Sequence, residues 1–329
     1  MSTDWNALVG TRVVARVRSP NGLYDVLGDL IGADDDLLRI VTKRGERQVP
    51  RANVIAGGPV PPAPSRAAPP HRALSVGDLE VVMADHWRAP ETDWLGGWLL
   101  RAAGGFTRRA NSALAVGEPG MPLDVAVLEV TDWYSDRGMT PLAATPHPTI
   151  DEEDAGQLLA AAEAFRAAGW QEVPGAGATV LTAPTGEVRA PRDLPAGLTL
   201  DLLEAPDAAW LARYHYRGEA VPPVGRELLA SAPEQVFAAV RDGGTTVAVA
   251  RGSLARRWAG VTAVEVDPAY RRRGLGAALV ARLGEWAWQH RAAAVYVQVG
   301  EGNEAGFALY GAAGFETHHT YAYLTPTSP

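Results

Sequence analysis

The segment Val261–Gly284 reads VTAVEVDPAYRRRGLGAALVARLG and contains three successive elements. Its first six residues are mainly apolar and β-branched, which predicts a strand that ends at Asp267-Pro268. A basic turn with two glycines follows. After the turn, apolar residues recur at helical spacing, namely at Leu275, Ala278, Leu279, Leu283 and Trp286. The segment therefore predicts a strand, a turn and a helix.

The turn Arg271–Gly276 has the features of an anion-binding site. The first backbone N–H groups of a helix have no partner inside the helix, and the helix dipole is positive at that end. Gly274 and Gly276 carry no Cβ, so a phosphate can approach the backbone closely. Three consecutive arginines add positive charge beside it. We expect this turn to bind a polyphosphate, and a pyrophosphate in particular.

The chain downstream of the turn carries further features in a fixed order. Val295–Val299 predicts a strand, and Asn303 lies just beyond it. Ala305–Phe315 predicts a short helix that contains Tyr310 and is capped by Gly314. Together with the turn, this ordered set resembles the GCN5-related N-acetyltransferase (GNAT) superfamily over roughly the last third of the chain.

The resemblance implies that acetyl-CoA is the coenzyme. The family's pyrophosphate motif falls on Arg271, Gly274 and Gly276, and its later Asn and Tyr fall on Asn303 and Tyr310. Backbone groups of the strand before the turn would pair with the pantetheine arm. The expected cofactor-binding set is therefore Val264, Val266, Arg271, Arg272, Arg273, Gly274, Leu275, Gly276, Ala277, Asn303 and Tyr310.

Two residues are candidates for proton transfer. Tyr310 is the expected general acid, because a phenol close to the sulfur can protonate the CoA thiolate as it leaves; the alternative is a tyrosine that only packs in the core. Glu265 is the candidate base, since it interrupts an apolar strand. It alternates with the valines on either side and could point away from the substrate. His215, Glu219 and His290 are weaker candidates.

Composition narrows the class of protein. The chain has 329 residues, a net charge of −8 and no cysteine. These values disfavour a nucleic-acid surface and exclude disulfides, cysteine-ligated metals and a cysteine acyl intermediate. There is no long apolar run, and the N-terminus does not resemble a signal peptide. We expect a cytoplasmic enzyme without a membrane span. We expect no metal, because the adjacent His318 and His319 would point to opposite faces of a strand.

The predicted fold is α/β (α+β) and has several parts. Short strands over residues 1–56 predict an SH3-like β-barrel, as a subunit-contact or ligand-recruiting module. Residues 57–72 are a proline-rich linker. Residues 73–184 form a GNAT-like domain, 185–196 a second linker, and 197–329 the catalytic GNAT domain.

The middle domain is predicted to be a degenerate copy of the catalytic one. Glu163–Trp170 aligns with Ala308–Phe315, so that Gly169 matches Gly314. The same offset places the phosphate turn at Glu118–Leu123, which contains an acid and two prolines. Proline donates no N–H and a glutamate repels phosphate. We therefore expect that this copy has lost CoA binding.

Of the two substrates, the acceptor is the one that the sequence determines less well. Arginine forks bind carboxylates, and a set of arginines near the start of the catalytic half favours an acidic small molecule: Arg213, Arg217, Arg251, Arg256 and Arg257. The domain order is similar to an actinobacterial group that includes unconventional N-acetylglutamate synthases, which implies the α-amine of glutamate. A protein or peptide amine, a non-catalytic CoA-sensing or assembly protein, and a homodimer stay open.

Overall fold

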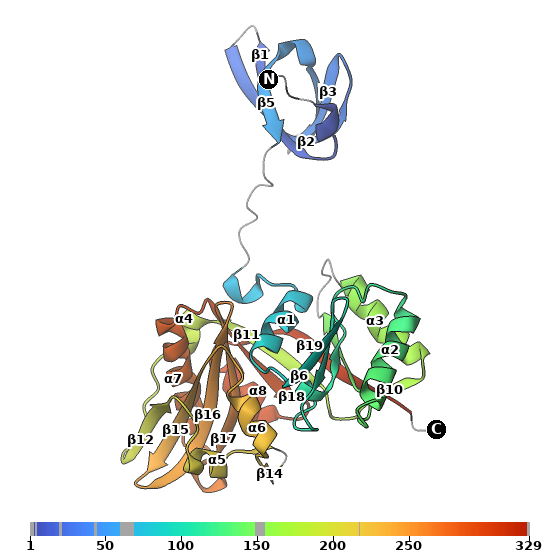
Figure 1. Ribbon diagram of the computed structural model, residues 1–329. Coiled ribbons are helices and arrows are strands. Elements are labelled where there is room, and N and C mark those ends of the chain that lie inside the picture. The colour runs from blue at the N-terminus through green and yellow to red at the C-terminus, as the bar shows by residue number, and fades with distance from the viewer. Residues whose placement is uncertain are drawn as a thin grey trace. The chain divides into compact units, whose positions relative to one another are not determined.

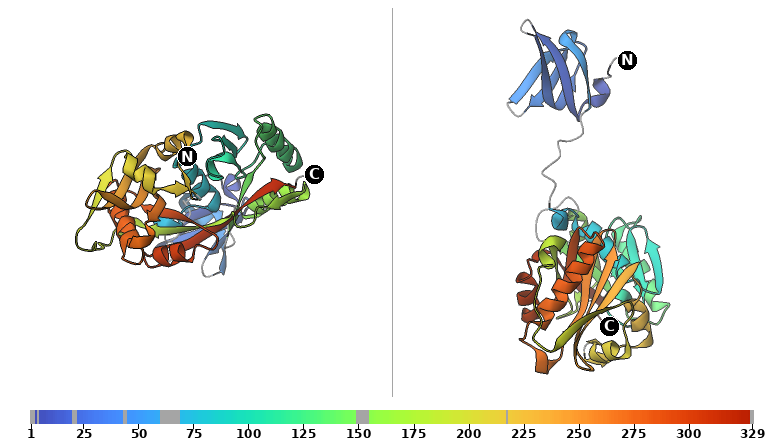
Figure 2. Two further views of the ribbon diagram at one scale, coloured as in Figure 1. Left: turned by 90° about the horizontal axis from the view of Figure 1, so that it is seen from below. Right: turned by 90° about the vertical axis from the view of Figure 1, so that its left-hand side faces the viewer.

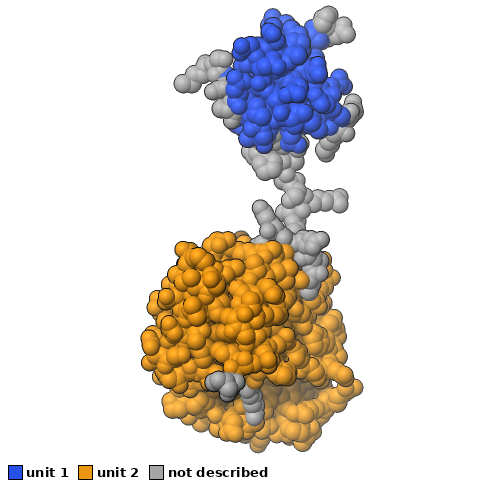
Figure 3. Space-filling model, turned by 90° about the vertical axis from the view of Figure 1, so that its right-hand side faces the viewer, with its two compact units in different colours: residues 1–68 blue, residues 69–329 orange. Residues whose placement is uncertain are grey.

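The computed structural model describes residues 3, 5–19, 22–42, 45–59, 69–148, 155–216 and 218–327. The chain divides into two compact units, Met1–Ala68 and Pro69–Pro329 (Figure 3). Most of the proline-rich segment that was predicted as a linker lies outside the described residues. Each unit has its own hydrophobic core.

The first unit is a small antiparallel sheet. Its strands are β1 (Arg12–Ser19), β2 (Gly22–Ala33), β3 (Leu37–Thr42), β4 (Gly45–Pro50) and β5 (Val54–Pro59), with the short 3₁₀ turns η1 (Asn6–Leu8) and η2 (Arg51–Asn53). Alternate residues of β2 are buried from Val26 to Gly32, as the period of a strand requires. Trp5 and Leu30 lie in the core.

The five predicted strands are therefore present, in the order β4-β3-β2-β1-β5. This order is open, since β4 and β5 are edge strands that do not pair with each other among the described residues. A closed SH3-like barrel is not confirmed. Asn21, expected in the turn between the first two strands, lies outside the described residues.

The second unit is built on one twelve-stranded sheet. Its strands are β6 (Glu91–Leu95), β7 (Trp98–Ala102), β8 (Ala113–Leu114), β9 (Ala143–Pro148), β10 (Trp170–Glu172), β11 (Ala178–Pro184), β12 (Leu198–Leu203), β15 (Glu234–Asp242), β16 (Thr245–Ala255), β17 (Trp258–Val266), β18 (Ala294–Gly300) and β19 (Glu316–Pro326). They follow the order β12-β15-β16-β17-β18-β11-β19-β9-β8-β7-β6, and β10 pairs with β19 (Figure 1). A separate hairpin joins β13 (His215–Tyr216) to β14 (Glu219–Ala220).

The helices of this unit are α1 (Val76–Asp85), α2 (Leu123–Ser135), α3 (Ala155–Ala167), α4 (Thr185–Val188), α5 (Ala208–Arg213), α6 (Pro223–Leu229), α7 (Leu275–Gln289) and α8 (Glu304–Gly311). The 3₁₀ turns are η3 (Pro70–Arg72), η4 (Arg109–Asn111) and η5 (Pro268–Tyr270). Alternation along β15 explains how helices cover both faces of the sheet. Val236 and Ala238 pack in the cluster that contains α7, whereas Phe237 packs with α5 and α6.

The same supersecondary unit occurs twice, once in each half of this unit. The predicted strand–turn–helix around Val261–Gly284 is present as β17 and α7, and β18 returns parallel to β17. In the first half, β8, α2 and β9 make the same parallel crossover. Two parallel strands joined by a helix in each half agree with the predicted duplication.

The two halves are joined by exchanged strands. β11, which closes the first half in the sequence, pairs with β18 and β19 of the second half. β19 in turn pairs with β9 and β10 of the first half. Figure 2 shows this sheet from two further sides. The predicted boundary at 185–196 falls inside one compact unit.

The segment expected as a second linker begins with a packed helix. Thr185 and Val188 of α4 are buried, and Val188 belongs to the same core as α7. Gly284 of α7 makes the contact close, because a Cβ there would lie 2.8 Å from the backbone nitrogen of Arg189. Among the described residues, no helix is both long enough and apolar enough to cross a membrane.

Candidate active site

The site begins where two parallel strands separate. β17 pairs with β18 only from Trp258 to Gly260, and the two strands then diverge. The register between β16 and β17 also shifts between Val249 and Arg251, opposite Ala263. Ala263 has a φ of 55°, in the left-handed region that a β-branched residue would rarely adopt. A bulge therefore bends β17 away from its neighbour and leaves its backbone beside a cavity.

The cavity has a volume of about 460 Å³ and is lined by both halves of the unit. The second half contributes the bulged stretch of β17, the end of β18 and α8, including Val264, Gln298, Glu301, Asn303 and Tyr310. The first half contributes Trp87, Thr107, Arg108 and Arg109. The structure thus brings together three predicted site residues: Val264, Asn303 and Tyr310.

Tyr310 lies on α8 and is buried, with 8% of its surface exposed. Its ring packs edge-on against Phe315 at 5.5 Å, and the backbone N–H of Phe315 donates to the Tyr310 carbonyl at 3.1 Å. Gly314, with a φ of 85°, makes this helix end possible, which confirms the predicted cap. Burial raises the pKa of the Tyr310 hydroxyl to about 12, so the phenol is protonated at neutral pH.

Asn303 has a structural contact as well as a place in the cavity wall. Its side-chain oxygen accepts a hydrogen bond from the backbone N–H of Gly306 at 2.9 Å, which caps α8. The cap sets the start of the helix that carries Tyr310. Asn303 caps the start of α8 and Tyr310 lies near its end, so this one short helix sets how far apart the two residues lie.

Glu265 is not brought to the cavity. One carboxylate oxygen accepts a hydrogen bond from the backbone N–H of His215 at 2.7 Å, and the other lies 3.4 Å from the His215 Nδ1. This contact holds the β13–β14 hairpin against β17. Another carboxylate, Glu301, does line the cavity. Sequence reasoning did not select Glu301, because it follows a strand without any distinguishing pattern.

The glycine turn has the conformation that an anion site needs. Gly274 is the N-cap of α7 with a φ of 84°, and a Cβ built on it would meet nothing within 4 Å. The space in front of the first free N–H groups of α7 is therefore open to a phosphate. Gly274 and Ala277 also line a cavity of about 370 Å³ between α7 and α8. These residues fit the diphosphate of a coenzyme.

The other residues of the predicted set contribute in different ways. The Nε of Arg271 donates to the carbonyl of Val266 at 3.3 Å, and the guanidinium of Arg273 lies 5.0 Å from the Tyr270 ring centroid. Arg272 has a φ of 61° in the turn. Leu275 and Gly276 begin α7: the Leu275 side chain is buried in the core, and a Cβ on Gly276 would meet Leu309 at 3.3 Å. The side chains of these residues thus make different contacts, and what the residues have in common at the turn is their backbone.

The arginines predicted to bind the acceptor are dispersed. Arg251 is fully buried, its Nε donates to the Leu229 carbonyl at 2.6 Å and its Nη2 to the His86 carbonyl at 3.1 Å, and burial lowers its pKa to about 10. Arg213 pairs with Asp267. Arg257 lies in the turn between β16 and β17, and Arg217 lies outside the described residues.

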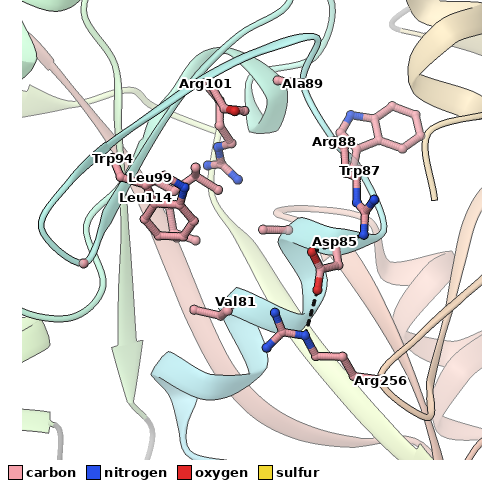
Figure 4. A pocket seen from close by; sticks show the side chains of 13 residues that line it. Val81, Asp85, Trp87, Arg88, Ala89, Trp94, Leu99, Arg101, Leu114 and Arg256 are labelled. Atoms are coloured by element: carbon pink, nitrogen blue, oxygen red, sulfur yellow. Dashed lines mark ion pairs between the residues drawn. The ribbon is translucent and has the colours of Figure 1, made fainter. Parts of the chain in front are cut away.

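Arg256 lies at a different cavity, of about 250 Å³, in the first half of the unit (Figure 4). Its Nε is 2.8 Å from a carboxylate oxygen of Asp85 on α1. Trp94 and Leu99 form an apolar wall of the same cavity. Arg256 is therefore neutralised by Asp85, and it does not line the cavity that contains Tyr310.

The corresponding turn of the first half is blocked by the chain itself. The backbone N–H of Gly97 donates to the Glu118 carbonyl at 2.6 Å, and a Cβ on Gly96 would lie 2.3 Å from the Pro119 carbonyl carbon. The turn between β6 and β7 thus packs directly on the segment where a phosphate would sit. Pro122 is the N-cap of α2 and makes no side-chain cap. The loss of CoA binding by this half stays a prediction.

The prediction that His318 and His319 point to opposite faces of a strand is wrong. Their Nδ1 atoms lie 2.9 Å apart, because a register shift between β11 and β19 at this point places both imidazoles on one side. The His319 Nε2 lies 3.0 Å from a carboxylate oxygen of Glu80. Among residues with described positions, no group of three or more His, Cys, Asp or Glu side chains is placed to hold a metal ion.

Comparison with known proteins gives a consistent family. The family described as "Probable histone acetyltransferase Rv0428c C-terminal" matches residues 75–324. The chain is 29% identical over 344 residues to "Probable histone acetyltransferase Rv0428c" of Mycobacterium tuberculosis, covering 99% of this chain and 97% of that protein.

Two solved structures have a similar fold. A GCN5-related N-acetyltransferase from Kribbella flavida is 17% identical, with a TM-score of 0.57 over 78% of this chain and 98% of that one. A tandem GNAT protein from the clavulanic acid biosynthesis pathway is 15% identical, with a TM-score of 0.54 over 76% of this chain and 89% of that one.

Proposed function

This chain belongs to the GNAT family of N-acetyltransferases, in the branch described by the Rv0428c C-terminal domain, and from that membership we propose that it acetylates a primary amine by direct attack on acetyl-CoA in a ternary complex. The observation that carries the proposal is a shared wall: Val264, Asn303 and Tyr310 line one cavity at the point where β17 leaves β18. The glycine turn that follows β17 is the proposed binding site for the diphosphate of the coenzyme.

In this mechanism the free amine attacks the thioester carbonyl, the C–S bond breaks, and CoA leaves as a thiolate. Tyr310 donates a hydrogen bond to the sulfur and guides its protonation. Complete transfer from a phenol of pKa about 12 to a thiolate of ordinary pKa would cost about 5 kcal/mol. Stabilisation of the developing charge is therefore the main contribution of Tyr310, and the proton released by the amine balances the reaction.

The base that takes a proton from the acceptor ammonium is one of two carboxylates. Glu265 is the candidate from the sequence, and it would have to act through water, because its oxygens are engaged by His215. Glu301 has the advantage of lining the cavity. Replacement of each by glutamine, with kcat measured against pH, separates them: the base is the residue whose loss removes the acidic limb of the profile.

The absence of cysteine from all 329 residues supports direct attack over an acyl-enzyme. The test is release of free thiol from acetyl-CoA in the presence of a panel of amines, with initial rates measured at several concentrations of both substrates. Intersecting lines are expected for a ternary complex. Parallel lines would contradict direct attack, and no thiol release with any amine, despite tight CoA binding, would favour a CoA-sensing protein.

Several finer assignments belong to the same proposal. The α-amine of glutamate is the first acceptor to test. A protein or peptide amine is the second, and it is supported by the mycobacterial relative, which is described as a probable histone acetyltransferase. The small N-terminal unit is proposed as an SH3-like contact module, and the cytoplasm as the location. A homodimer is the proposed assembly to test by light scattering.

A further inference from the structure

Arg109 is a half-buried arginine without a counter-ion, and it lines the cavity that contains Tyr310. Its Nε is closed off from solvent and has no hydrogen-bond partner among the described residues. No described carboxylate lies within 4.0 Å of its guanidinium. The nearby acid Glu80 is already engaged by the Nε2 of His319 at 3.0 Å. Burial disfavours the charged form, but the neighbouring tyrosines, chiefly Tyr321, and Glu80 outweigh this effect and raise the pKa of Arg109, so its guanidinium stays charged.

Other buried arginines of this protein are satisfied by the chain. The Arg101 guanidinium donates to the Ser112 carbonyl at 2.9 Å and to the Ser112 hydroxyl at 3.0 Å. Arg251 donates to two carbonyls, those of Leu229 and His86. These two arginines have structural roles that are visible in the folded chain. Arg109 differs because it lines a cavity and its Nε has no hydrogen-bond partner among the described residues.

The loop that carries Arg109 is held in place by its own hydrogen bonds. The Asn111 side-chain oxygen accepts from the backbone N–H groups of Ala103 and Gly105, and its amide donates to the carbonyls of Phe106 and Thr107. The Trp87 indole N–H donates to the Thr107 hydroxyl at 3.0 Å. The position of Arg109 is therefore set before any ligand arrives, which lowers the entropic cost of binding.

The surroundings of the guanidinium are aromatic. The Trp87 ring centroid lies 6.0 Å from the Arg109 Cζ. Burial raises the pKa of the Tyr321 hydroxyl, an effect that the neighbouring Arg109 opposes. Aromatic walls exclude water without neutralising the charge, so an anion that enters the cavity meets a strong attraction.

We propose that Arg109 binds a carboxylate of the acceptor, so that the substrates are amines that also carry a carboxylate. This inference rests on the proposed acetyltransferase function. In it, the half of the unit that has lost CoA binding supplies the acceptor site, and the other half supplies the thioester. Glu301, in the same cavity, is suited to the ammonium end of such an acceptor. The planar fork of an arginine binds a carboxylate through two parallel hydrogen bonds.

The test compares matched pairs of amines on the full chain with acetyl-CoA. Each pair consists of an amino acid and its carboxamide, which keeps the amine and loses the negative charge. The pairs include L-glutamate and a series in which more methylenes separate the amine from the carboxylate. Arg109→Gln is expected to lower kcat/KM for the carboxylates by roughly 10- to 100-fold and to leave the carboxamides unchanged. Arg109→Lys should give an intermediate loss, because it retains the charge without the fork.

The control is Arg256→Gln, which removes an arginine that lies at the other cavity and pairs with Asp85. It should leave the preference for carboxylates intact. Unfolding temperatures show whether each variant is folded. If Arg109→Gln fails to fold, Arg109→Lys alone decides the question.

A second measurement separates this inference from the proposed activity. Calorimetric titration of the CoA-saturated protein with the same amino acids reports binding without turnover. Loss of carboxylate binding in Arg109→Gln supports the inference even if no thiol is released by the wild type. Equal use or equal binding of amino acids and carboxamides by the wild type would overturn it and leave the acetyltransferase assignment standing.

Discussion

The Nδ1 of His86, just after α1, lies 2.9 Å from the hydroxyl of Ser253 on β16, although the two residues are 167 positions apart in the sequence. His86 is 1% exposed, and its ring packs edge-on against Tyr296 at 5.0 Å. The carbonyl of the same residue accepts from Arg251. The two halves thus share a buried polar contact next to Trp87, which lines the cavity, and the proposed acceptor site depends on their being packed as one unit.

The pH dependence of stability follows from this contact. Burial, with a smaller effect of nearby arginines, lowers the pKa of His86 to about 3, against about 6.5 in the unfolded chain. Between these values the unfolded chain binds the extra proton, so stability rises with pH. The contribution is complete above pH 6.5 and is lost as pH falls towards 3, by at most about 5 kcal/mol.

Denaturant unfolding at several pH values between 4 and 7 measures this effect. His86→Gln should make the pH dependence of stability less steep. A smaller dependence should remain, because burial and His319 lower the pKa of His318 to about 4 and this acts in the same direction. An unchanged slope in His86→Gln would contradict the assignment to His86.

Tyr310→Phe should lower kcat by about 100-fold or more, because the departing sulfur loses its hydrogen-bond donor. Binding of acetyl-CoA should be almost unchanged, since the ring still packs against Phe315. Thiol release gives kcat and calorimetry gives the Kd of the coenzyme. Equal losses in both would show that the hydroxyl serves coenzyme binding and does not stabilise the departing sulfur.

Gly274→Ala should weaken acetyl-CoA binding about tenfold. A φ of 84° costs an alanine about 1–2 kcal/mol, so the turn shifts and its N–H groups move away from the diphosphate. Gly311→Ala is the matched control, because Gly311 lies on α8, has no left-handed φ, and a Cβ there meets nothing within 4 Å. Titration calorimetry with CoA compares the two. A similar loss in both variants would argue against the glycine turn as the phosphate grip.

Arg251→Gln should destabilise the second unit by about 2–4 kcal/mol, because the buried carbonyls of Leu229 and His86 lose their donor. Arg109→Gln should destabilise it less, since the Arg109 Nε has no hydrogen-bond partner to lose and Tyr321, the side chain that bonds with Arg109, lines the same cavity. Chemical denaturation of both variants measures the difference. A comparable loss of stability in Arg109→Gln would mean that this arginine is structural.

The sequence could predict most elements of the second half, because their signals are local. α7 and β18 lie where apolar spacing placed them. The first half was predicted with less precision. The sequence from Asp78 to Ala89 favours a helix, but α1 ends at Asp85, since His86 and Trp87 leave the helix to contact Ser253 and Thr107. The C-terminal end of α1 is thus set by long-range packing, which a local sequence pattern does not predict.

The sequence by itself determined the proposed coenzyme half of the site. Its determinants are backbone N–H groups, a left-handed glycine and a helix start, all within the six residues Arg271–Gly276, so their geometry follows from local chain conformation. Only the tertiary structure decided the proposed acceptor half. Whether an arginine is neutralised, as Arg256 is by Asp85, or left facing a cavity, as Arg109 is, depends on groups that distant parts of the chain bring beside it. Charge partners are set by folding, and spacing along the chain does not encode them.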